Sequence, residues 1–94
     1  MIILVINCGS SSIKYQLLDM KNDDVYSLLA KGIVEKIGLE CGRLQHTPAG
    51  KEKVVKDLPV PDHTVGMQIV LDALIDKDHG VLKSFDDIEA VGHR

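Results

Sequence analysis

The residues near the start of the chain that could do chemistry form one short polar segment. It carries one amide, three hydroxyls and one ammonium group, on Asn7, Ser10, Ser11, Ser12 and Lys14. Gly9 precedes the hydroxyls, and a glycine lets the backbone approach a ligand closely or adopt φ > 0. Successive backbone N–H groups in such a turn form an anion-binding concavity, to which hydroxyls add donors and an ammonium adds charge. Together, these residue types suit a phosphate group.

Two apolar segments flank these residues and must position them. Residues 2–6 read Ile-Ile-Leu-Val-Ile, a wholly apolar run that is typical of a buried strand. Beyond the serines, Ile13, Tyr15 and Leu17 alternate with polar residues, which predicts a second strand. The sequence therefore predicts a hairpin that pairs residues 2–7 with residues 13–19 in antiparallel orientation and carries the polar segment at its tip.

The spacing of this segment excludes two widespread phosphate-binding motifs. The G-x-x-x-x-G-K-[ST] and G-x-G-x-x-G motifs both need further glycines, and the second also opens a helix. This segment has a single glycine and is followed by a strand, so a phosphate bound here would lack a helix dipole. An ordinary serine–glycine hairpin turn has the same residue types, which alone leave both interpretations open.

The remainder of the chain predicts a mixed α/β architecture. Further strands are expected over residues 25–34, 43–47 and 51–58, and a last one begins at Ala90. Both faces of the 25–34 strand carry apolar residues and are expected to be covered. The lysines of the 51–58 strand, Lys51, Lys53 and Lys56, would protect an exposed sheet edge.

One helix is expected after residues 59–61, where two prolines break the strand pattern. Over residues 63–77, apolar side chains recur at helical spacing, at Met67, Val70, Leu71, Leu74 and Ile75. Asp62 or Thr64 suits the N-cap and Gly80 suits the end of this helix, which would pack against one face of the sheet.

Composition narrows the classes of protein further. The 94 residues suit one domain at most, and a net charge of −3 without a basic stripe argues against a nucleic-acid partner. No apolar run is long enough to cross a membrane and no signal peptide is recognisable, so we expect a cytoplasmic protein without a membrane partner. Cys8 and Cys41 lack the spacing of a metal or redox motif and are expected to be reduced.

The histidines offer no metal site. His46, His63, His79 and His93 lack the spacing of metal ligands. We expect them to be polar surface residues, with His63 making a contact at the start of the predicted helix.

Four segments together resemble the acetate kinase family of the actin, sugar-kinase and Hsp70 ATPase superfamily. They lie in the family's order at residues 7–15, 50–53, 61–64 and 90–94, and the first and last are the most specific. The resemblance implies an α/β fold: the amino-terminal part of an actin-like, ribonuclease H-like ATPase domain, with a mixed sheet, an antiparallel first hairpin and a covering helix. Because the family's enzymes are several times longer, residues 1–94 are expected to be a single incomplete domain, the amino-terminal fragment of a larger two-domain kinase.

The same resemblance implies the reversible transfer of the ATP γ-phosphoryl group to acetate, giving acetyl phosphate and ADP with Mg²⁺. Asn7 would lie at the Mg²⁺–phosphate site, the three serines 10–12 would line the phosphate loop, and Lys14 would meet ATP phosphate. Arg94 would be catalytic and would bind the acetate carboxylate or the transferring phosphoryl group, because a planar fork suits both. The fragment alone would be inactive, and the full-length enzyme would be a homodimer.

Two other functions stay open at this point. A propionate kinase or another short-chain acyl kinase would share the loop and differ only in its acyl pocket. A non-catalytic module that binds a nucleotide or phosphate fits the shortness of the chain.

Overall fold

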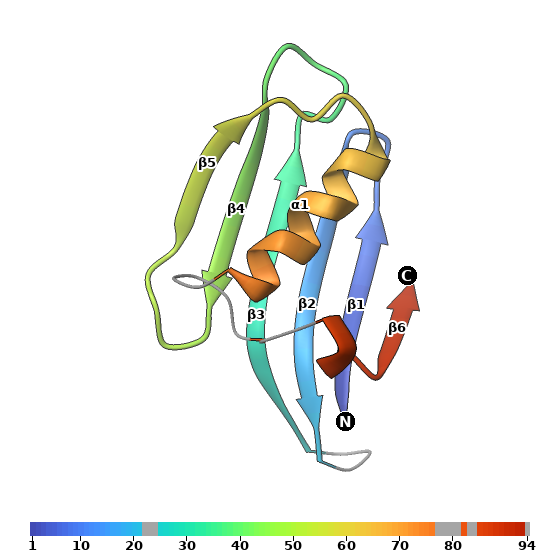
Figure 1. Cartoon of the computed structure of the whole chain (residues 1–94), viewed down its shortest axis with the longest axis vertical. Helices are drawn as coiled ribbons and strands as arrows, with labels where there is room; N and C mark the ends of the chain where they lie inside the picture. Colours follow the sequence, from blue (N-terminus) through green and yellow to red (C-terminus); the bar gives the residue numbers. More distant parts are fainter. Residues whose placement is uncertain (22–24, 77–81, 83–84, 94) are drawn as a thin grey trace.

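A six-stranded mixed β-sheet with one helix across a single face forms the molecule (Figure 1). This computed structural model describes residues 1–21, 25–76, 82 and 85–93. The strands are β1 (Ile2–Cys8), β2 (Ser12–Met20), β3 (Tyr26–Glu35), β4 (Gly42–Pro48), β5 (Val54–Leu58) and β6 (Ala90–His93). The helix is α1 (His63–Ile75), and a short 3-10 turn, η1 (Phe85–Asp87), precedes β6. The sheet order is β5-β4-β3-β2-β1-β6.

The pairing of the strands confirms the predicted hairpin and the mixed sheet. β1 and β2 are antiparallel with Ile2 opposite Asp19 and Cys8 opposite Ile13. The next three strands continue as an antiparallel meander, whereas β6 returns after α1 to lie parallel to β1. A parallel pair needs such a crossover connection, because the chain must travel back to the same end of the sheet.

The hydrophobic core lies between α1 and the sheet face that it covers. Alternate residues of the strands and one face of α1 supply it, and it includes Leu4, Ile6, Ile13, Tyr15, Leu17, Ala30, Val34, Leu44, Val70 and Leu74. On the other face, Val5 and Ile33 are only half-buried among polar side chains. The expectation that both faces of the third strand are covered is therefore wrong for the described residues, because the only helix longer than one turn there lies on one side.

The helix begins as predicted and ends earlier. Asp62 is the N-cap, and its carboxylate accepts a hydrogen bond from the Val65 N–H at 2.9 Å. α1 ends at Ile75, not at 77, and Gly80 lies outside the described residues. Its buried stripe also includes Gly66, which the sequence analysis did not select. A Cβ on Gly66 would be 3.0 Å from Ile13 Cδ1, so this glycine lets the start of α1 approach β2 closely.

The innermost polar contact of the core spans three strands. Tyr15 on β2, Gly32 on β3 and His46 on β4 lie side by side in the register. The Tyr15 side chain passes over Gly32, and its hydroxyl forms a 2.5 Å hydrogen bond with His46 Nδ1. His46 is only 1% exposed, so its predicted surface position is wrong. Burial by this core raises the pKa of the Tyr15 hydroxyl, which therefore stays neutral.

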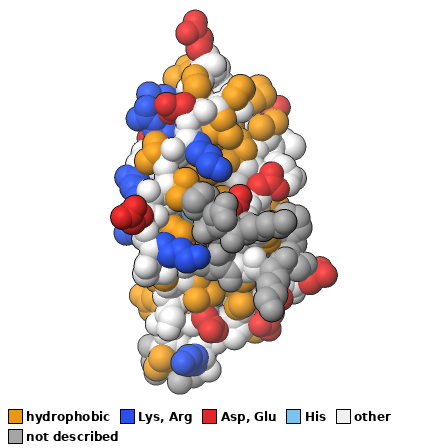
Figure 2. All heavy atoms as spheres, turned by 60° about the vertical axis from the view of Figure 1, so that its left-hand side comes forward, with side chains coloured by type: hydrophobic (Ala, Val, Ile, Leu, Met, Phe, Trp, Pro, Cys, Tyr) orange, Lys and Arg blue, Asp and Glu red, His pale blue; other side chains and the backbone are white. Residues whose placement is uncertain are grey.

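The edge formed by β5 is charged, as predicted, although β5 is shorter than expected. It begins at Val54, so Lys51 and Lys53 precede it and Lys56 lies within it, exposed. Figure 2, in which this side is turned forward, shows basic and acidic side chains interspersed with hydrophobic ones. Charges along an edge strand discourage pairing with another chain.

Replacing Gly32 tests the packing of Tyr15 across β3. An alanine Cβ at this position would collide with the Tyr15 hydroxyl and with the Gln45 carbonyl oxygen. We expect Gly32→Ala to lower the free energy of unfolding by about 1–3 kcal/mol, measured by urea denaturation. The control is Gly92→Ala in β6, where no atom lies within 4 Å of an added Cβ. Equal stability of the two variants would contradict the packing described.

Candidate phosphate-binding site

The polar segment forms a tight turn between β1 and β2. Asn7 pairs with Lys14, and the Gly9 N–H donates a 2.8 Å hydrogen bond to the Ser12 carbonyl oxygen, which leaves only Ser10 and Ser11 at the tip. Both tip serines are exposed, and Ser12 is half-buried at the start of β2. The segment leads into a strand and not into a helix, as the sequence predicted.

Gly9 leaves room for the Ser12 side chain. Its φ is not among the positive values, which occur in this structure at Lys36, Gly38 and Gly50 among the described residues. A Cβ on Gly9 would instead lie 2.9 Å from Ser12 Oγ. The structure thus does not use Gly9 for a positive φ, and close approach of a ligand to its backbone stays a prediction.

The carbonyl groups of the turn are held by hydrogen bonds from neighbouring elements. The Ile37 N–H, in the connection between β3 and β4, donates to the Ser11 carbonyl oxygen at 3.0 Å. His63, the first residue of α1, contacts the Gly9 carbonyl oxygen through Nε2 at 2.9 Å. Among the described residues, the N–H groups of Ser10 and Ser11 have no acceptor. The carbonyl groups of Gly9, Ser11 and Ser12 are therefore engaged within the protein, whereas the two exposed N–H groups have no acceptor among the described residues and can bind an anion.

Asn7 and Lys14 meet on the sheet face that α1 does not cover. Together they line a hollow of about 390 Å³, whose other polar contributors are Gln16, Lys31, Gln45, Thr47 and Lys53. Among the described residues, three lysines and no carboxylate line the hollow, so its local charge favours an anion. The hollow crosses the sheet from β1 to β4, and Asn7 and Lys14 join it to the end of the hairpin that carries the turn.

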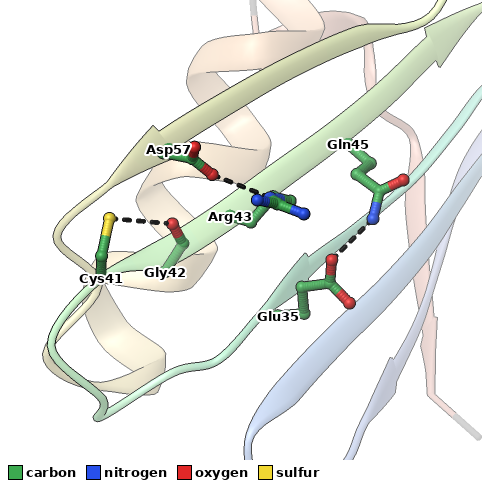
Figure 3. A network of polar contacts seen from close by, with 6 residues as sticks. All are labelled: Glu35, Cys41, Gly42, Arg43, Gln45 and Asp57. Atoms are coloured by element: carbon green, nitrogen blue, oxygen red, sulfur yellow. Dashed lines mark hydrogen bonds and ion pairs between the residues drawn. The ribbon is translucent and has the colours of Figure 1, made fainter.

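Carboxylates near the hollow are engaged by neighbouring side chains. Figure 3 shows Gln45 donating to the Glu35 carboxylate, at 2.6 Å, and Arg43 donating to Asp57, at 2.8 Å. The hydrogen bond from Arg43 lowers the pKa of the Asp57 carboxyl. These contacts tie β4 to both of its neighbours and leave Lys14 without a competing carboxylate in the hollow.

The structure brings together most of the predicted site residues. Asn7, the three serines and Lys14 all belong to the one hairpin. Arg94 lies outside the described residues, and the neighbouring β6 ends at His93, opposite Ile6. No group of three or more histidine, cysteine or acidic residues is arranged to hold a metal ion within the described ranges. Cys8 and Cys41 are free, and both are exposed.

The sequence predicted that His63 makes a contact at the start of the helix, but not which residue it contacts. The sequence analysis expected a contact at the start of the helix, and the structure confirms one. Its acceptor is 54 residues earlier in the chain, and no local pattern indicates so distant a pair. The one sequence signal is the position of His63 directly after the N-cap Asp62.

The fold is that of the amino-terminal part of an actin-like ATPase domain, with an antiparallel first hairpin, a covering helix and a returning strand parallel to β1. The chain belongs to the acetokinase family, whose model matches residues 2–94.

Named relatives agree with this assignment. The acetate kinases of Treponema denticola and Moorella thermoacetica are 58% and 53% identical to the chain over 92 residues. The crystal structure of Porphyromonas gingivalis acetate kinase matches with a TM-score of 0.91 and 45% identity, covering 99% of this chain and 23% of that one. A propionate kinase from Francisella tularensis matches with a TM-score of 0.76 and 30% identity, covering 99% of this chain and 22% of that one.

The chain spans a minor part of these relatives. The two curated acetate kinases are matched over 98% of this chain and 22% of their own length. Separately, no helix among the described residues has the length and apolar character needed to cross a membrane.

Replacing the N-cap tests how firmly the start of α1 is held beside the turn. We expect Asp62→Ala to lower the free energy of unfolding by about 1 kcal/mol, because the Val65 N–H loses its acceptor. The control, Asp72→Ala, removes an exposed carboxylate that accepts only from Gln68 on the same helix, and its cost should be about 0.5 kcal/mol or less. Denaturant unfolding of both variants measures the difference. A cost for Asp62→Ala no larger than the control would refute the capping role.

Proposed function

We propose that this chain is the phosphate-binding part of an acetate kinase, which transfers the γ-phosphoryl group of ATP reversibly to acetate. The observation that carries the proposal is the β1–β2 turn, where the Ser10 and Ser11 N–H groups find no acceptor among the described residues and Asn7 and Lys14 flank them. Membership of the acetokinase family and the likeness to named acetate kinases support the identity of the substrates.

In this proposal, the turn holds the phosphates of ATP. Backbone N–H groups and serine hydroxyls at positions 10–12 donate hydrogen bonds to phosphate oxygens. Lys14 adds an ammonium that neutralises part of their charge. Attack by a carboxylate on phosphorus requires little proton transfer, so catalysis depends on alignment and charge neutralisation.

We assign Asn7 to the Mg²⁺ that accompanies ATP. Its exposed amide oxygen is a neutral ligand, and it faces Lys14 across the hairpin. Lys14 is a cationic neighbour of Asn7, and the described residues contain no acidic cluster. Both features fit contact with the ion through coordinated water better than coordination by protein groups alone. When bound, Mg²⁺ would neutralise part of the phosphate charge of ATP. Acidic ligands would come from other parts of the full-length protein.

We assign Arg94 to the acetate carboxylate or to the phosphoryl group in transfer. It is bonded to His93, the last residue of the strand that pairs with β1 beside Ile6. A guanidinium can bind a carboxylate or a phosphoryl group at two points, which a single ammonium cannot do.

A propionate kinase is the second candidate, because a propionate kinase is among the structural relatives. Acetate is favoured, since the acetate kinase structure has both the higher identity, 45% against 30%, and the higher TM-score, 0.91 against 0.76. Steady-state assays of the full-length protein with acetate and propionate decide between them. Nucleotide binding without turnover of either acid would favour a non-catalytic module.

We further propose that residues 1–94 are the amino-terminal fragment of a two-domain, cytoplasmic, homodimeric enzyme. The 22% coverage of the acetate kinases supports the fragment. The fragment by itself should form no acetyl phosphate, because it contains too little of the site. Sedimentation of the full-length protein tests the dimer.

Lys14 should contribute mainly to ATP binding. It supplies one ammonium to a phosphate that several other donors also hold, so Lys14→Ala in the full-length enzyme should chiefly raise the KM for ATP. The KM for acetate should stay close to wild type. Lys51→Ala, an exposed lysine between β4 and β5, is the charge-matched control. An unchanged KM for ATP would remove Lys14 from the site.

Arg94 should contribute mainly to the transition state. Arg94→Lys keeps the charge and loses the two-point geometry, so kcat/KM should fall roughly 10²-fold or more, about 3 kcal/mol. Arg94→Ala should cost more, and added guanidinium should partly restore it. Kinetics with acetate and ATP varied separately measure the effects. Near-wild-type turnover of Arg94→Lys, or a change confined to the KM for ATP, would contradict this assignment.

A further inference from the structure

We infer that His63 is a positioning residue, which orients the peptide group between Gly9 and Ser10 so that the Ser10 N–H faces a bound phosphate. This inference rests on the proposed function of the turn. It concerns a side chain on α1 that lies outside the hairpin and has no place in the roles given above.

The geometry of one peptide group carries the first step. His63 Nε2 lies 2.9 Å from the Gly9 carbonyl oxygen. A carbonyl oxygen can only accept a hydrogen bond, so Nε2 carries the hydrogen and His63 is the donor. In a planar trans peptide, the carbonyl of one residue and the N–H of the next point in opposite directions. Holding the Gly9 carbonyl toward α1 therefore turns the Ser10 N–H away from α1.

The other contacts of the turn single out His63. The remaining ties, from Gly9 N–H to Ser12 and from Ile37 N–H to Ser11, use backbone donors that a substitution does not remove. His63 supplies the one side-chain donor to a carbonyl of this turn among the described residues. Without it, the Gly9–Ser10 peptide loses the contact that fixes its direction, while the hairpin pairs around it remain.

The start of α1 is held well enough to perform this task. Asp62 caps the helix through the Val65 N–H, and the Gly66 N–H donates to the Asp62 carbonyl oxygen at 3.0 Å. Gly66 is buried, and a Cβ added to it would lie only 3.0 Å from Cδ1 of Ile13 on β2. α1 therefore contacts β2 one turn after His63. This contact and the N-cap hold the backbone that carries the imidazole in place.

The test uses the full-length enzyme and three variants. His63→Leu fills a similar space and has no donor. His63→Gln places its amide Nε2 as many bonds from the backbone as the histidine Nε2, so it restores the donor. Thr64→Ala, at an exposed neighbouring position of α1, is the control. The measurements are the KM values for ATP and acetate, the dissociation constant of ATP by calorimetry, and the melting temperature.

We expect His63→Leu to raise both the KM and the dissociation constant for ATP roughly tenfold, the loss of about one hydrogen bond to a charged group. The KM for acetate should change little. His63→Gln should return both ATP constants to within about threefold of wild type, as expected if the donor is what matters. Thr64→Ala should match the wild type.

Two results would overturn the inference. One is unchanged ATP binding in His63→Leu, and the other is failure of His63→Gln to recover binding when its melting temperature is that of the wild type. A failure of the proposed function looks different, because the wild type itself would then not phosphorylate acetate. The calorimetric arm still tests His63 in that case, because it measures ATP binding without turnover.

Discussion

The register of the β1–β2 hairpin is the constraint on which the candidate site depends. Leu4 and Ile6 on β1 face the core with Ile13 and Leu17 on β2, and each buried side chain of this size contributes about 1.5–3 kcal/mol. A slip by one residue would turn all of them to the opposite face. Because side chains alternate, the burial that forbids such a slip also places Asn7 and Lys14 on the uncovered face. Core packing thus positions polar groups that take no part in it.

A second constraint lies in the middle of the sheet, where Tyr15 crosses β3 to reach His46. The Tyr15 ring and the His46 ring are nearly parallel, at 20°, with centroids 5.9 Å apart, and only a residue without a side chain fits between them on β3. Their hydrogen bond satisfies two polar groups that would otherwise be costly to bury. The neutral Tyr15 hydroxyl suits that contact, and it links β2 with β4 across Gly32.

The sequence pattern of a short segment predicts those features of the fold that depend on residues close together in the sequence. A wholly apolar run followed by an alternating segment predicted the first hairpin, and the break at two prolines followed by Asp62 predicted the start of α1. Burial of His46 depended on Tyr15 and Gly32, which are far from it in sequence, so its residue type alone suggested the surface. The contact between His63 and Gly9 was not predicted either, because the two residues lie 54 positions apart in the sequence. The buried face of α1 includes Gly66, which the hydrophobic pattern did not select. A close contact between helix and sheet needs a small residue at that point, and a hydrophobicity pattern does not identify small residues.

The place of β6 in the sheet has a consequence for the synthesis of the chain. Every other strand pairs with its neighbour in sequence, whereas Ala90 of β6 pairs with Ile3 near the opposite end of the described chain. The local hairpins can form as soon as they leave the ribosome, but β1 must wait for β6. Until then, the most apolar strand has an open edge with unpaired backbone groups. An open strand edge of this kind is a template on which another chain can pair.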